Sequence, residues 1–290
     1  MVAERRGRNE ATTNLSDGVA IRWRPPAVEL EALSALLAPW RALTDPVFFG
    51  LEHVPDDGPV VLVGNHSIFG LLDLPLMIDG IRRERGRFVR GLADHAHFAV
   101  PAWRDMLVRF GAVRGTRDNC RALLAAGEAV LVYPGGGREV AKRKGESYQL
   151  IWKQRMGFAR MAIEAGCPIV PFGAVGAEDS YDILIDADSP ILAPARGIVK
   201  RLGGQWELVW PIARGVGLTP LPRPERFYFA FGEPIPTAAW TGRHDDQRAL
   251  RVVRDRTRKS VQQRLEFLQE HRNHDPDRDL IARVRRRLPI

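Results

Sequence analysis

A histidine and an aspartate that could together accept a proton follow a short apolar segment. His66 comes directly after the valine-rich run 59–63, in the segment Gly64-Asn65-His66-Ser67, and Asp73 lies seven residues further on. In an open α/β sheet, ligands bind beyond the carboxyl ends of the strands, so His66 stands where chemistry is usually found. A carboxylate on one ring nitrogen fixes the tautomer and raises the basicity of the other. If the loop folds Asp73 back onto the ring, the pair can activate an attacking hydroxyl, like a catalytic triad without its serine.

The spacing of these two residues also allows a purely structural interpretation. A histidine after a strand can cap a turn, and an aspartate before an amphipathic stretch can be the N-cap of a helix. Spacing alone leaves both interpretations open.

A second segment whose residues could take part in catalysis or binding is Tyr133-Pro134-Gly135-Gly136-Gly137-Arg138-Glu139. It follows another apolar run at 129–132. Three glycines let the backbone approach a ligand closely, and their N–H groups can form a nest for a developing oxyanion or a phosphate. The spacing is not that of a nucleotide-binding P-loop. A plain turn is the alternative.

The elements that must position these residues alternate along the chain. We predict strands at 59–63, 87–92, 129–133, 168–174 and 227–231, and helices at 72–85, 101–110, 118–126 and 154–165. Such alternation indicates an α/β fold with a mostly parallel central sheet flanked by helices. The stretch 183–224 is rich in Pro and Gly and has no clear pattern.

Two further helices are predicted at the ends of this region. An amphipathic helix at 28–43, which includes Trp40, follows a polar tail, and a long basic helix spans 243–273. We therefore expect a tail and amphipathic helix at 1–44, a central domain at 45–240 and a basic helical extension at 241–290.

Taken in order, the motifs resemble those of the glycerolipid acyltransferase superfamily. The resemblance covers about residues 45–240 and is carried by Asn65-His66-Ser67 with Asp73, Arg114-Gly115-Thr116-Arg117, the block 133–139 and Ile169-Val170-Pro171-Phe172. The phospholipid branch has a His-x4-Asp motif and a PEGTR block, whereas this chain has His-x6-Asp and Pro-Gly-Gly-Gly-Arg-Glu. That variant is similar to the branch that contains diacylglycerol acyltransferases and phytyl ester synthases.

The resemblance implies an α/β acyltransferase and a role for each motif. His66 would deprotonate a lipid hydroxyl, Asp73 would orient His66, and the backbone of Gly135, Gly136 and Gly137 would hold the oxyanion. Substrate binding would fall to Asn65, Ser67, Arg114, Arg117, Arg138 and Glu139, although Arg114 and Arg117 fit a solvated basic surface equally well.

The resemblance also limits the substrates. The donor would be a thioester, acyl-CoA or acyl carrier protein, with no bound cofactor and no metal. In the phospholipid branch, arginines of these motifs bind the phosphate of the acceptor, and this chain matches them only loosely. The expected acceptor is therefore diacylglycerol, a related glycerolipid or a long-chain alcohol. Lysophosphatidate is the alternative acceptor.

Composition narrows the partners and the location. The chain has 43 Lys and Arg against 35 Asp and Glu, a formal net charge of +8, so it should prefer anionic partners such as anionic lipid or nucleic acid. Basic residues interleaved with aromatic ones are missing, so we do not expect nucleic-acid binding. A non-catalytic lipid- or nucleic-acid-binding protein is the alternative from another class. The sequence does not determine the oligomeric state.

The sequence has neither the apolar core of a signal peptide nor a run of about 18 apolar residues that could span a bilayer. Cys120 and Cys167 lack metal-binding spacing, which fits a reducing compartment. We therefore expect a cytoplasmic protein, peripheral on the inner face of a membrane. Either terminal helix could make the membrane contact; the alternatives are that the first packs on the core and that the second has a solvated basic face.

Overall fold

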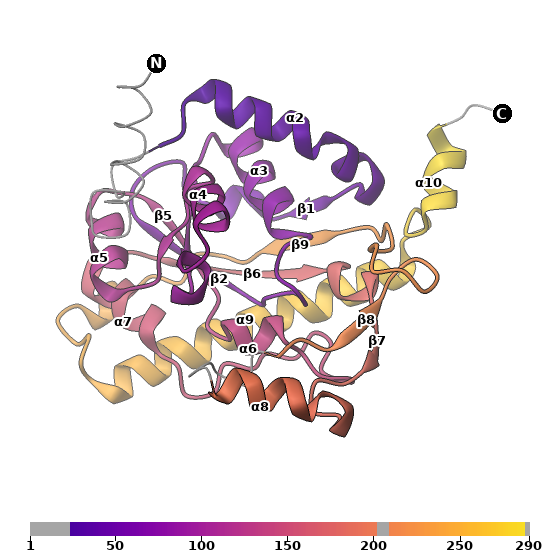
Figure 1. Cartoon of the computed structure of the whole chain (residues 1–290). Coiled ribbons are helices and arrows are strands. Elements are labelled where there is room, and N and C mark those ends of the chain that lie inside the picture. The colour runs from indigo at the N-terminus through magenta and orange to yellow at the C-terminus, as the bar shows by residue number, and fades with distance from the viewer. Residues whose placement is uncertain (1–23, 202–208, 288–290) are drawn as a thin grey trace, which may run out of the picture.

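A seven-stranded sheet forms the centre of the molecule, with helices on both faces (Figure 1). The computed structural model describes residues 24–201 and 209–287 of the 290-residue chain. The strand order is β1-β9-β6-β2-β5-β3-β4. The strands are β1 (Val47–Phe49), β2 (Val60–Gly64), β3 (Val89–Ala93), β4 (Val113–Arg114), β5 (Ala129–Val132), β6 (Ile169–Val175) and β9 (Tyr228–Phe231). All neighbouring pairs are parallel except β6 and β9, so the predicted α/β class with a mostly parallel sheet is confirmed.

Strand β2 lies in the middle of this sheet, between β5 and β6. All five of its residues are buried, and Val61 pairs with Ile169 while Val63 pairs with Val132. A parallel strand covered on both faces needs apolar side chains on both sides, which is why the run of valines predicted it. The segment that follows β2 is thereby placed at the centre of the carboxyl edge.

Helices pack on the two faces of the sheet and enclose separate apolar clusters. One face is covered by α2 (Ala27–Thr44) and α3 (Leu74–Arg85). The other is covered by α4 (Pro101–Arg109), α5 (Arg117–Ala125), α7 (Gly157–Ala165) and α9 (Gln247–His274). A four-residue helix, α6 (Gly137–Val140), lies at the carboxyl edge, and α10 (Leu280–Arg287) ends the described chain.

The long basic helix is part of the core. Its predicted apolar set, Leu250, Val253, Val261, Leu265 and Leu268, is buried in the cluster beneath the sheet, and α9 packs along β6. Its apolar stripe completes the main core, in which Arg272 of the same helix is also buried, and the domain boundary expected at 241 stays a prediction.

The predicted amphipathic helix is present as α2, and its aromatic residue faces inward. The indole N–H of Trp40 donates to the carbonyl of Leu72 at 2.9 Å, and its ring meets Phe227 edge-on at 5.9 Å. Val28 and Leu36 on the same helix remain exposed. Most of the polar tail expected before it, residues 1–23, lies outside the described residues. No helix in the described ranges is long and apolar enough to cross a bilayer.

A small separate unit lies beside the carboxyl edge, in the stretch without a clear sequence pattern. It contains β7 (Asp182–Ile185), α8 (Ala193–Arg201) and β8 (Ile212–Arg214), and β7 and β8 pair antiparallel as a two-stranded sheet (Figure 1). We call residues 182–201 and 209–221 the β7–α8–β8 unit.

Candidate active site

Three chain segments meet at the carboxyl edge of the central strands. His66 follows β2, the block 133–139 follows β5, and a short 3-10 turn at Ala177–Ser180 follows β6. Because β5, β2 and β6 are adjacent and parallel, their carboxyl ends lie side by side. Parallel sheets bind ligands at this edge.

The His66 ring is held by stacking and by a tight turn. It lies on the Tyr133 ring, with centroids 4.0 Å apart and planes inclined by 22°. Phe69 and Gly70 both adopt positive φ, of 60° and 65°, so the chain curls over the ring. A Cβ at Gly70 would lie 2.5 Å from Cε1 of His66, which explains why this position is glycine.

Burial determines the charge of this ring. It lowers the pKa of His66 to about 3, and the nearby Lys142 ammonium and His97 act in the same direction. The imidazole is therefore neutral near pH 7. A neutral imidazole has a lone pair on one ring nitrogen and can accept a proton from a hydroxyl group.

Asp73 does not make the predicted hydrogen bond with His66. Its buried carboxylate stands at the N-cap position of α3 and accepts a hydrogen bond from the Ser67 hydroxyl at 2.7 Å. Among the described residues, no hydrogen bond joins Asp73 to the imidazole. Burial raises the pKa of Asp73, and the bond from Ser67 opposes that rise. The bond to His66 does not form for a local reason: the buried Ser67 hydroxyl needs an acceptor, and Asp73 is the one it reaches.

Glu139 lies beneath the His66 loop and is fully buried. One carboxylate oxygen accepts the backbone N–H of His66 at 3.0 Å, and the other accepts that of Ile151 at 2.7 Å. Burial raises the pKa of Glu139 to about 7, although Lys142 and the two N–H groups favour the charged form. The predicted substrate contact is thus replaced by an internal one, in which Glu139 fixes the main chain of His66.

The glycine block is shaped around that carboxylate. A Cβ at Gly135 would lie 2.1 Å from Cδ of Glu139, so only glycine fits there. Gly136 donates its N–H to the carbonyl of Tyr133 at 3.0 Å, which removes it from the predicted oxyanion donors. Within the described part of the chain, the N–H groups of Gly135 and Gly137 donate to no acceptor.

A buried ion pair next to His66 and Glu139 was not predicted from the sequence. Lys142 pairs with Glu178, and both side chains are buried. The Lys142 charge lowers the pKa of His66, Asp73 and Glu139, so it lies within electrostatic reach of all three. No sequence signal distinguishes it, because Lys142 stands in a charged segment that is typical of a solvated surface.

Asn65 and Arg138, both predicted to bind substrate, are engaged inside the protein. Asn65 exchanges two hydrogen bonds with the backbone of Ala174, at 2.8 and 2.9 Å, and so ties the end of β2 to β6. Arg138 forms two contacts with the Glu146 carboxylate, at 2.6 and 2.8 Å. Neither side chain is placed as the prediction required, because each satisfies a polar group of the protein.

The predicted basic block lies away from His66. Arg114 ends β4, and its guanidinium lies 5.5 Å from the centre of the Phe98 ring. Arg117 is exposed at the start of α5. Strands β5 and β3 stand between β2 and β4, so the fold does not bring these arginines beside the histidine.

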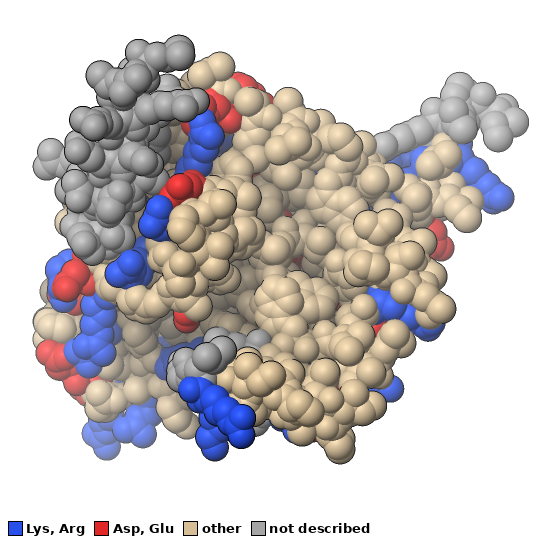
Figure 2. Space-filling model, in the orientation of Figure 1, with Lys and Arg blue, Asp and Glu red and all other residues tan. Residues whose placement is uncertain are grey.

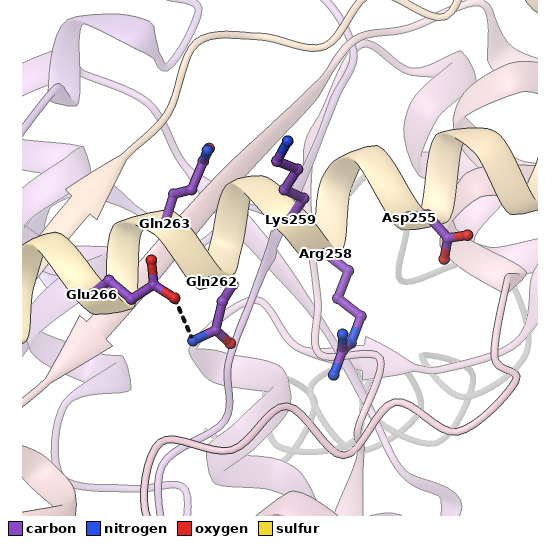
Figure 3. A pocket seen from close by; sticks show the side chains of 6 residues that line it. All are labelled: Asp255, Arg258, Lys259, Gln262, Gln263 and Glu266. Atoms are coloured by element: carbon purple, nitrogen blue, oxygen red, sulfur yellow. Dashed lines mark hydrogen bonds between the residues drawn. The ribbon is translucent and has the colours of Figure 1, made fainter.

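A cavity of about 400 Å³ adjoins the site between the main domain and the β7–α8–β8 unit. Its walls combine apolar side chains such as Ile68 and Leu184 with charged ones of both signs, which include Lys142, Lys144, Glu178, Asp182 and Arg214. A second hollow of about 410 Å³ is lined only by polar residues of α9, where Gln262 donates to Glu266 (Figure 3). Only the first hollow touches the His66 loop, through Ile68.

Comparison with known proteins identifies the region that contains this site. Residues 46–175 match the family model described as Acyltransferase. The chain carries an acyltransferase domain. The matched range contains His66, Asp73 and Glu139 and ends at the last residue of β6.

The acyltransferase domain has curated relatives with lipid-related names. The chain is 34% identical over 252 residues to phytyl ester synthase 1, chloroplastic, from Arabidopsis thaliana, a match that covers 81% of this chain and 36% of that protein. It is 36% identical over 122 residues to the human DGAT1/2-independent enzyme synthesizing storage lipids, covering 42% and 37% of the two chains. The chain thus spans little more than a third of the length of these relatives.

One solved structure resembles the chain at low sequence identity. The 1-acyl-sn-glycerophosphate acyltransferase PlsC from Thermotoga maritima aligns with a TM-score of 0.45 at 15% identity, over 86% of this chain and 85% of that one.

Proposed function

We propose that this protein transfers a fatty acyl group from a thioester, acyl-CoA or acyl carrier protein, to the hydroxyl group of a lipid. One observation carries the proposal: a neutral imidazole, His66, is held rigidly at the carboxyl edge within the acyltransferase domain. Rigid placement of a proton acceptor is what general-base catalysis requires.

In the proposed reaction, His66 takes the proton of the acceptor hydroxyl as its oxygen attacks the thioester carbonyl. The tetrahedral oxyanion would be held by the N–H groups of Gly135 and Gly137, which donate to no acceptor among the described residues. Collapse of this intermediate forms the C–O ester bond and breaks the C–S bond, and the leaving thiolate takes the proton from His66. The buried Asp73 carboxylate would offset the charge on the ring while it is protonated. The proposal needs no metal and no bound cofactor.

A neutral acceptor, diacylglycerol or a long-chain alcohol, is the favoured substrate. Arg138 is paired with Glu146, and Arg114 lies beyond β5 and β3, so neither is placed to hold a phosphate beside His66. The names of the relatives, a phytyl ester synthase and an enzyme of storage lipids, agree with a neutral lipid product.

Lysophosphatidate is a second candidate acceptor. The cavity beside Ile68 has the exposed Lys144 in its wall, and its ammonium group could meet a phosphate group. Since acceptors of either kind reside in bilayers, we propose that the protein works as a peripheral protein on the cytoplasmic face of a membrane.

The test is acyl transfer by the purified protein. A radiolabelled acyl thioester is incubated with diacylglycerol, a long-chain alcohol or lysophosphatidate, and the products are separated by thin-layer chromatography. We expect labelled neutral ester from the wild type and a loss in kcat of about 10²–10⁴-fold for His66→Ala.

The matched control is His274→Ala, which removes an exposed histidine at the far end of α9. It should retain full activity, and circular dichroism should show that both variants are folded. Turnover by folded His66→Ala within threefold of the wild type would rule out the proposed mechanism.

A further inference from the structure

The β7–α8–β8 unit exposes an unusual amount of apolar surface. It holds about an eighth of the described residues but almost half of the large apolar side chains that are exposed in the described chain. The most exposed are Leu218, Ile191, Leu221, Ile198 and Trp210. In Figure 2 the region over β7, β8 and α8 is largely free of Lys, Arg, Asp and Glu, which gather at its margins. Contiguous apolar surface of this kind marks a site of interaction.

The unit has little internal packing to account for its structure. Helix α8 has nine residues and none of them is buried, and Gly197 lowers its helical propensity further. Isolated helices of this length are marginal in water, and so is a two-stranded sheet such as β7–β8. A surface that covers the exposed side chains of the unit would stabilise both elements.

The unit borders the loop that carries His66 and the cavity next to that loop. The Trp210 ring lies 5.2 Å from that of Phe69, which belongs to the turn over His66. Ile183, Leu184 and Arg214 of the unit line the cavity that reaches Ile68. A lipid that left a bilayer beneath this unit would meet the cavity directly.

The charges of the unit fit an anionic surface. Its carboxylates are turned toward cations of the protein: Asp182 pairs with Arg214 and Arg223, and Asp188 pairs with Arg143. Lys200 and Arg201, at the end of α8, are exposed and make no ion pair within the described ranges. Basic residues beside an apolar face are typical of segments that lie in a membrane interface.

We propose that the β7–α8–β8 unit binds the protein to an anionic lipid bilayer, so that acceptor dissolved in the membrane can pass into the cavity beside the His66 loop. The passage of acceptor to the cavity rests on the proposed acyltransferase function, whereas the binding of the unit to the bilayer does not. The apolar side chains enter the headgroup region, and Lys200 and Arg201 contact lipid phosphates.

The experiment measures binding of the full chain to sedimenting vesicles of phosphatidylcholine with or without phosphatidylglycerol. We expect Ile191→Gln with Ile198→Gln to weaken binding at least tenfold, because two exposed apolar side chains no longer enter the bilayer. Lys200→Glu with Arg201→Glu should weaken binding to anionic vesicles at least tenfold and flatten its salt dependence. The matched control is Val28→Gln with Leu36→Gln, which removes equally exposed apolar side chains from α2 and should bind as the wild type does.

Activity measurements separate docking from catalysis. None of these variants should change transfer to a short, water-soluble alcohol, and the two variants of the unit should lose transfer to acceptor in vesicles. His66→Ala should bind vesicles normally, so failure of the proposed chemistry would leave the binding result intact.

Two results would overturn the proposal. One is unchanged vesicle binding by the Ile191 and Ile198 double variant, or a loss confined to the α2 control. The other is a wild-type dimer that this double variant dissociates while vesicle binding is unaffected, since a second copy of the chain would then cover the face.

Discussion

Replacing Glu139 by glutamine should damage catalysis far more than stability. The carboxylate accepts the backbone N–H groups of both His66 and Ile151. A glutamine has the same shape but only one acceptor oxygen, so its NH₂ group faces one of the two N–H donors. The main chain at His66 must then shift or lose its partner.

Two opposing free-energy changes decide the size of the effect. Leaving a buried N–H group without an acceptor costs about 1–3 kcal/mol. Against this, the pKa of Glu139 is raised from its ordinary value of 4.5 to about 7, which corresponds to about 3 kcal/mol of unfavourable burial of charge at pH 8. Glutamine removes that penalty, so the free energy of unfolding at pH 8 should change by only about 1 kcal/mol. The displaced imidazole, however, should lower kcat by about 10–100-fold with little change in KM.

The pH dependence gives a second signature of the same residue. Folded Glu139 holds its proton up to about pH 7 while the unfolded chain releases it near 4.5, so the wild type loses stability as pH rises through this window. The variant lacks this loss, and its stability relative to the wild type should improve by about 2–3 kcal/mol between pH 5 and pH 8. In the wild type, kcat/KM should fall below pH 7 as Glu139 is protonated.

Urea unfolding at a series of pH values and steady-state acyl transfer measure these effects. The matched control is Glu128→Gln, a buried carboxylate that pairs with Arg24 before the start of β5, at the opposite edge of the sheet. It should lose stability and keep kcat. An unchanged kcat in Glu139→Gln, or a fall in its kcat/KM below pH 7 like that of the wild type, would refute the positioning role.

Two further predictions concern the same site. Gly135→Ala should lower the free energy of unfolding in urea by about 1–3 kcal/mol and reduce kcat, because the new Cβ would lie 2.1 Å from Cδ of Glu139. The control Gly157→Ala should change this free energy little, because no atom lies within 4 Å of its Cβ. Equal effects of the two substitutions would contradict the steric argument. Because the unfolded chain protonates His66 near pH 6.5 and the folded protein only near 3, the free energy of unfolding should fall as pH drops through this window, by up to about 1.4 kcal/mol per pH unit relative to His66→Ala. Parallel stability curves for the two proteins would show that the imidazole is not held neutral.

The sequence predicted the architecture because its signals are local. Buried parallel strands require continuous apolar runs, so 59–63 predicted β2 and 168–174 predicted β6 to within a residue or two. The β7–α8–β8 unit could not be predicted in the same way. None of the nine residues of α8 is buried, so packing in a core imposed no apolar stripe on this helix.

The partners of the site residues were harder to predict, because hydrogen bonding depends on where side chains meet in space. The spacing of His66 and Asp73 allowed a direct contact, but the acceptor that Ser67 needs was Asp73 itself. Arg114 follows a strand just as His66 does, yet the order of strands across the sheet places the two apart. Chain order does not fix strand order, since each crossover can skip a neighbour.

By itself, the sequence determined that a histidine and a glycine-rich turn follow apolar strands of an α/β sheet, since strands and turns are encoded by neighbouring residues. Only the tertiary structure decided that Glu139 accepts the backbone N–H of His66 and that Lys142 is buried against Glu178. It also decided that an apolar unit borders the cavity. The physical reason is that burial and pairing are set by segments far apart in the chain. The same glutamate would be a solvated charge if β2 and β5 were not neighbours in the sheet.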